Sequence, residues 1–61
     1  MVDKELIAQL RKFKTEKGYT LHDLSKMLDI SVSTLERWLT TERINRLYAR
    51  MVREKLGLEE G

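Results

Sequence analysis

Two helix-start signals lie close together near the middle of the chain, and they restrict its possible folds more than any other feature. Thr20 has an acidic residue three positions later, Asp23, and Ser31 precedes a segment of helical periodicity, so both resemble N-caps. The two caps are eleven residues apart, so the helix that begins at the first must end near Leu28. About three residues, Asp29 to Ser31, then remain to turn the chain. The sequence predicts two short helices joined by an abrupt turn.

Apolar residues recur at helical spacing along the rest of the chain, and the alternation typical of strands does not persist. Gly18 and Gly57 follow the first and last periodic segments, where left-handed helix ends favour glycine. We predict a compact all-α domain of four, or at most five, helices. The expected helices lie near residues 3–17, 20–28, 31–40 and 44–56, followed by a frayed tail at 58–61. In the last helix the expected core stripe is Ile44, Leu47, Tyr48, Met51, Val52 and Leu56.

A chain of 61 residues has room for one domain with a small core. It contains no cysteine, which excludes disulfides and thiolate-bound zinc as sources of stability. We therefore expect a second subunit, in a homodimer, to supplement the core. Charged residues interrupt every apolar stretch, so we expect no transmembrane span or signal-peptide core and place the protein in the cytoplasm.

Positive charge is concentrated in two segments, although the formal net charge is only +2. Residues 11–17 hold four basic residues against one acidic residue, and residues 37–55 hold six against two. This distribution is compatible with a polyanionic partner. Catalysis is not expected, because His22 is the only histidine and there is no cysteine nucleophile. The sequence indicates no cofactor, metal or small-molecule substrate.

The helix expected at 31–40 has one apolar and one polar face. At about 100° per residue, Leu35, Trp38 and Leu39 point inward, and the opposite face is polar. A short helix held after a tight turn can enter the major groove of DNA and read base edges. The candidate base-reading residues on this helix are Ser31, Val32, Ser33, Glu36 and Arg37.

The run KFKTEKGYTLHDLSKMLDISVSTLERWL resembles the Cro and phage-repressor (XRE-like) helix-turn-helix family, and the likeness extends from Arg11 to Gly57. It implies a lambda-repressor-like fold that binds double-stranded DNA. Leu21, Asp29 and the loop after the third helix depart from the family, which often has Gln, Gly, and Gly with Pro at these places. The phosphate contacts expected from this likeness and from the polar helix face involve Thr20, Thr40, Arg43, Asn45 and Arg46.

We therefore expect a sequence-specific DNA-binding protein, a small transcriptional regulator that acts as a homodimer on paired half-sites. Two alternatives remain at this point. A MerR-like or excisionase-like DNA-binding domain would carry a β-wing after the recognition helix. A protein-interaction module, such as an antitoxin or adaptor, would use the helix at 44–56 to bind a partner.

Overall fold

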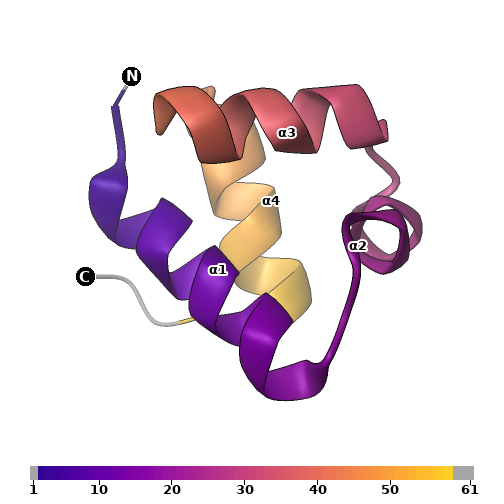
Figure 1. Ribbon diagram of the computed structural model, residues 1–61. Helices are drawn as coiled ribbons and strands as arrows, with labels where there is room; N and C mark the ends of the chain where they lie inside the picture. The colour runs from indigo at the N-terminus through magenta and orange to yellow at the C-terminus, as the bar shows by residue number, and fades with distance from the viewer. Residues whose placement is uncertain (1, 59–61) are drawn as a thin grey trace.

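The chain folds into four α-helices within residues 2–58, the part that this computed structural model describes. The helices are α1 (Lys4–Lys17), α2 (Leu21–Leu28), α3 (Val32–Thr41) and α4 (Arg46–Leu56). In Figure 1, α3 lies across the top of the domain, α1 crosses in front of α4, and α2 is viewed nearly along its axis. An isolated antiparallel bridge joins Val2 to Arg43, and residues 2–58 form no strand. The predicted all-α class is confirmed.

Local capping accounts for most of the helix ends. The Thr20 hydroxyl accepts from the Asp23 backbone N–H (3.1 Å), and the Asp23 carboxylate accepts from the Thr20 N–H (2.9 Å), which completes a capping box. Asp3 and Ser31 are the N-caps of α1 and α3, and the side chain of each accepts from the backbone N–H three residues later. Gly18 adopts the left-handed conformation at the end of α1, with φ of 71°. The first three predicted helices are correct to within one residue at each end.

The predicted start of α4 is wrong by two residues. Ile44 does not belong to the helix: it is buried in an extended segment that connects α3 to α4. The Asn45 side chain accepts from the Leu47 N–H at 2.8 Å and is therefore the N-cap. Ile44 follows the helical spacing of the later apolar residues, so periodicity alone extended the helix too far.

The predicted core stripe of α4 is also wrong in part. Leu47 is 76% exposed and Tyr48 is 49% exposed, whereas Ala49 and Val52 are buried. The inward face contains Ala49, Val52, Arg53 and Leu56, at helical spacing of three and four residues. Because this face includes a small residue and an arginine, a prediction based on large apolar side chains did not identify it.

One cluster of buried apolar side chains joins all four helices. Trp38 lies within it, as expected, and is 5% exposed, while Met27 of α2 is 40% exposed and contributes less than its helical position suggested. Leu58 packs against the cluster and donates its N–H to the Arg53 carbonyl at 2.9 Å, so it is not frayed; residues 59–61 lie outside the described residues. The buried members are Leu6, Ile7, Leu10, Leu24, Leu28, Leu35, Trp38, Ile44, Ala49 and Val52.

Two helices end on non-glycine residues in the left-handed conformation. Asp29 has φ of 57° after α2, and Glu42 has φ of 60° after α3. Side chains with a Cβ adopt this conformation at a cost, which Asp bears better than most residues. Asp29 is therefore strained, and a second strained position, Glu42, occurs in the loop between α3 and α4, which contains no glycine.

We expect Asp29→Gly to raise the free energy of unfolding by about 0.3–1 kcal/mol, because removing Cβ strain outweighs the added freedom of the unfolded chain. Asp29→Ala is the matched control. Ala keeps the Cβ but adopts the left-handed conformation less readily than Asp, so this variant should be less stable than the wild type. Urea denaturation of the three proteins at one pH provides the measurement. A loss of stability in Asp29→Gly would contradict this account of the turn.

Candidate nucleic-acid interface

The outer face of α3 carries the side chains that the sequence assigned to base reading. Ser31, Ser33, Glu36 and Arg37 are exposed, and Val32 is partly buried at the first position of the helix. Leu35 and Trp38 occupy the opposite face and are buried. The helix is therefore fixed to the domain along one side and presents hydroxyl groups, one carboxylate and one guanidinium along the other.

The start of α3 is tied to α2 by contacts across the turn. The Ser25 hydroxyl donates to the Ile30 carbonyl at 2.5 Å, and the Ile30 N–H donates to the Ser25 carbonyl at 3.1 Å. At the helix start, the Ser31 hydroxyl accepts from the Thr34 N–H at 3.2 Å. These bonds leave little freedom for α3 to rotate relative to α2, so the direction of its outer face is set by the turn.

The far end of α3 is held by side chains from α1 and α4. The Arg11 guanidinium of α1 donates to the Leu39 carbonyl, where the negative end of the α3 dipole favours a cation. The Trp38 and Tyr48 rings lie 5.8 Å apart between centroids and are tilted by 48°, which joins α3 to α4. Sequence reasoning missed the role of Arg11, since its acceptor lies 28 residues away and no local signal marks the pair.

Thr20, a predicted phosphate-binding residue, is exposed at the start of α2, but its backbone N–H is already used. That N–H donates to the Asp23 carboxylate, and the hydroxyl oxygen accepts from the Asp23 N–H. The hydroxyl proton of Thr20 is what remains to contact a phosphate. These two capping bonds lower the pKa of Asp23 below its ordinary value, and the bond from the Thr20 N–H has the larger effect.

The remaining predicted phosphate-binding residues lie at the end of α3 and in the segment that follows. Thr40, Arg43, Asn45 and Arg46 are all exposed. Part of this segment is ordered by Thr41, whose hydroxyl donates to the Arg37 carbonyl at 2.8 Å and accepts from the Arg43 N–H at 3.2 Å. Asn45 uses its side-chain oxygen as a helix cap, so its amide NH₂ is the group that can donate to a phosphate.

Arginines of this surface are not neutralised by neighbouring carboxylates. Within residues 2–58 the ion pairs join Lys12 to Glu16 (3.8 Å), Arg50 to Glu54 (3.3 Å) and Arg53 to Asp3 (3.2 Å). Arg37, Arg43 and Arg46 take part in none of them, so their charge is available to an anion.

The described part of the chain contains neither a metal-binding cluster nor a membrane-spanning helix. Residues 2–58 bring together no group of three or more histidine, aspartate or glutamate side chains suited to a metal ion. Among the helices of this same region, none has the length and apolar character needed to cross a bilayer. Comparisons of the chain with protein-family models, curated proteins and solved structures found no match.

The capping box predicts a specific dependence of stability on pH. Because the pKa of Asp23 is lower in the folded state, its stabilising contribution is present above the unfolded pKa and is lost as the pH falls through the folded pKa. Asp23→Asn retains an oxygen that can accept from Thr20 and cannot be protonated in this range. Between about pH 5 and about pH 2, we expect wild-type stability to fall more steeply than that of Asp23→Asn. Thermal denaturation at several pH values measures both, and parallel curves would contradict the prediction.

Proposed function

We propose that this protein binds double-stranded DNA sequence-specifically, with α3 in the major groove, and acts as a small transcriptional regulator. One observation carries the proposal: α3 follows a three-residue turn, is fixed by its buried face, and presents Ser33, Glu36 and Arg37 outward. Recognition helices in helix-turn-helix proteins need this combination of a rigid base and a polar, projecting face.

Base reading and backbone binding fall to different residues in this proposal. The Arg37 guanidinium can donate to O6 and N7 of guanine, and the Ser33 hydroxyl can donate to or accept from a base edge. Arg43, Arg46 and the Asn45 amide follow the helix and are suited to phosphates, which position the protein without conveying sequence. The uncompensated charge of the arginines supports this division.

The winged alternative receives no support from the described residues. A MerR-like or excisionase-like domain needs a β-hairpin after its recognition helix, and residues 42–58 contain instead a short connection, α4 and the turn that ends it. The isolated bridge at Arg43 pairs with Val2, near the start of the chain, and not with a second strand of a hairpin.

The exposed apolar surface of α4 favours an additional role in association. Leu47 and Tyr48 are 76% and 49% exposed and are adjacent on the first turn of the helix. Exposed apolar groups of this kind occur at protein interfaces. We assign this surface to a homodimer that places two copies of α3 on half-sites about 34 Å apart. A different protein as the occupant is the second candidate.

Sedimentation tests the homodimer. We expect a dimer at tens of micromolar, and a shift towards monomer in Leu47→Glu, which places a charge in the apolar contact. Met27→Glu is the matched control, because Met27 is a 40% exposed apolar residue on α2 rather than α4. A wild-type protein that stays monomeric, both free and on DNA, would remove the homodimer from the proposal.

Arg37→Ala and Arg43→Ala should impair DNA binding in different ways. Removal of a bidentate guanine contact should cost about 1–3 kcal/mol on the best site and little on random DNA. Removal of a phosphate contact should weaken all sequences alike and reduce the slope of log affinity against log salt by about one unit per contact. Arg37→Ala should therefore flatten the preference at one base position, while Arg43→Ala leaves the preferred motif unchanged.

The preferred motif is first obtained by selecting bound fragments from random duplex DNA with the wild-type protein. Isotherms on that duplex and on a scrambled one, at several salt concentrations, then compare the two variants. Recovery of no motif would reject sequence-specific binding. Equal decreases in affinity on both duplexes for Arg37→Ala would move base reading away from Arg37.

A further inference from the structure

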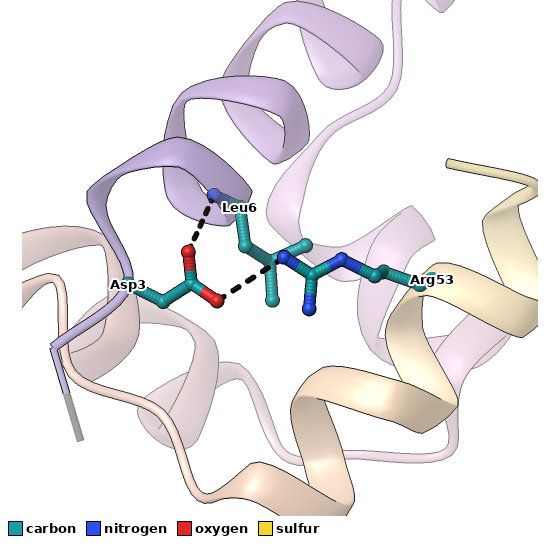
Figure 2. Close-up of polar contacts among 3 residues, drawn as sticks. All are labelled: Asp3, Leu6 and Arg53. Atoms are coloured by element: carbon teal, nitrogen blue, oxygen red, sulfur yellow. Dashed lines mark hydrogen bonds and ion pairs between the residues drawn. The ribbon is translucent and has the colours of Figure 1, made fainter. Parts of the chain in front are cut away.

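Asp3 lies where three parts of the fold meet. Its carboxylate accepts from the Leu6 N–H at 2.9 Å, which caps α1, and from an Arg53 Nη at 3.2 Å, which reaches α4 (Figure 2). Its backbone N–H donates to the Glu42 carbonyl at 2.9 Å, in the connection between α3 and α4. One residue near the start of the chain therefore contacts both Glu42, where the proposed phosphate-binding loop begins, and α4, which follows that loop.

The pair of Asp3 and Arg53 is shielded from solvent. The two side chains are 14% and 17% exposed, whereas those of the Arg50–Glu54 pair on the same helix are 78% and 68% exposed. A charge-assisted bond is stronger where water screens it less, and removing one partner leaves the other charge poorly solvated. Arg53 Nε is buried without a hydrogen-bond partner in residues 2–58, so Arg53 depends on the Asp3 contact for its pairing.

The connection between α3 and α4 needs external support. Glu42 holds a left-handed conformation that disfavours residues with a Cβ, and the connection contains no glycine. The backbone bond from Asp3 to Glu42 and the bridge from Val2 to Arg43 restrain this strained backbone from the N-terminal side. Three of the residues proposed to bind phosphate, Arg43, Asn45 and Arg46, come directly after the strained residue.

We propose that Asp3 is a positioning residue for DNA binding: through Glu42 and Arg53 it holds residues 42–46, the loop before α4 and the first residue of that helix, in the geometry that presents Arg43, Asn45 and Arg46 to phosphates. This inference rests on the proposed function. Asp3 itself does not contact DNA, since its carboxylate is occupied by Leu6 and Arg53. Breaking the ion pair should therefore affect backbone binding and leave the base preference intact.

Asp3→Asn tests this role with little change in shape. Asn caps helices about as well as Asp, so the bond to Leu6 is retained, while the charge that holds Arg53 is removed. Glu54→Gln is the matched control, because it makes the same change in net charge and breaks an arginine pair on the same helix, at an exposed place. Circular dichroism confirms that both variants are folded at the assay temperature.

Binding to a fixed duplex is then measured at several salt concentrations. We expect the slope of log affinity against log salt to fall in Asp3→Asn, relative to Glu54→Gln, by about one unit for each phosphate that the displaced loop no longer binds. The motif selected from random duplex DNA should be the same for both. A general decrease in stability would not lower the slope selectively, so this readout separates positioning from folding.

Nitrogen-15 relaxation of the free proteins gives a readout that does not involve DNA. Order parameters of residues 42–46 should fall from about 0.85 towards 0.6 in Asp3→Asn and stay unchanged in Glu54→Gln. If Asp3→Asn does not fold, Arg53→Lys replaces it, with Arg50→Lys as its control, because each keeps the charge and removes the planar fork. A smaller change in the same direction is then expected.

The outcomes separate the inference from the function on which it rests. Equal salt slopes and equal loop order in Asp3→Asn and Glu54→Gln, with a wild type that binds DNA, would overturn the role of Asp3 alone. A wild type that binds no duplex would overturn the proposed function and, with it, the role of Asp3 in DNA binding. A reduced slope together with a looser loop would support both.

Discussion

The turn between α2 and α3 is the constraint on which the rest of the structure depends. Asp29 ends α2 in a left-handed conformation, and the two bonds between Ser25 and Ile30 close the turn. With so few residues between the helices, the direction of α3 follows from that of α2. Burial of Leu35 and Trp38 then determines which face of α3 is covered. The short turn and the burial of these two side chains together leave the polar face of α3 exposed.

Long-range contacts hold the helix ends, in addition to the small core. Arg11 binds the C-terminal end of α3, Tyr48 lies against Trp38, and Asp3 joins the chain's beginning to α4. Each contact anchors an end of a helix or the loop beside it, rather than the middle of the core. The strain at Glu42 is tolerated because the backbone on either side is restrained. The same contacts act on the segment that we propose binds phosphates. A segment already held in its bound geometry loses less conformational entropy on binding.

Charge is used for two purposes in this chain. Arg53 is inward-facing and paired with Asp3, so it contributes to the fold, whereas Arg37, Arg43 and Arg46 are exposed and remain without an acidic partner in residues 2–58. In the net charge of the chain, each of these arginines counts equally. Their different burial explains why a small net charge is compatible with a locally basic surface, since compensation takes place inside the domain and on the outer faces of α1 and α4.

Local sequence signals determined that there are four helices, the bounds of the first three and the exposed face of α3, because a cap, a glycine stop or a helical stripe acts over only a few residues. For that reason the helix starts at Thr20 and Ser31 and the helix end at Gly18 could be predicted. Only the tertiary structure decided the rotation of α4, the strain at Glu42 and the partner of Asp3. The inward face of α4 includes Arg53, whose charge is shielded from most solvent and is paired with a carboxylate fifty residues away. A pattern of neighbouring residues cannot contain such a partner, so the sequence by itself pointed to Leu47 instead.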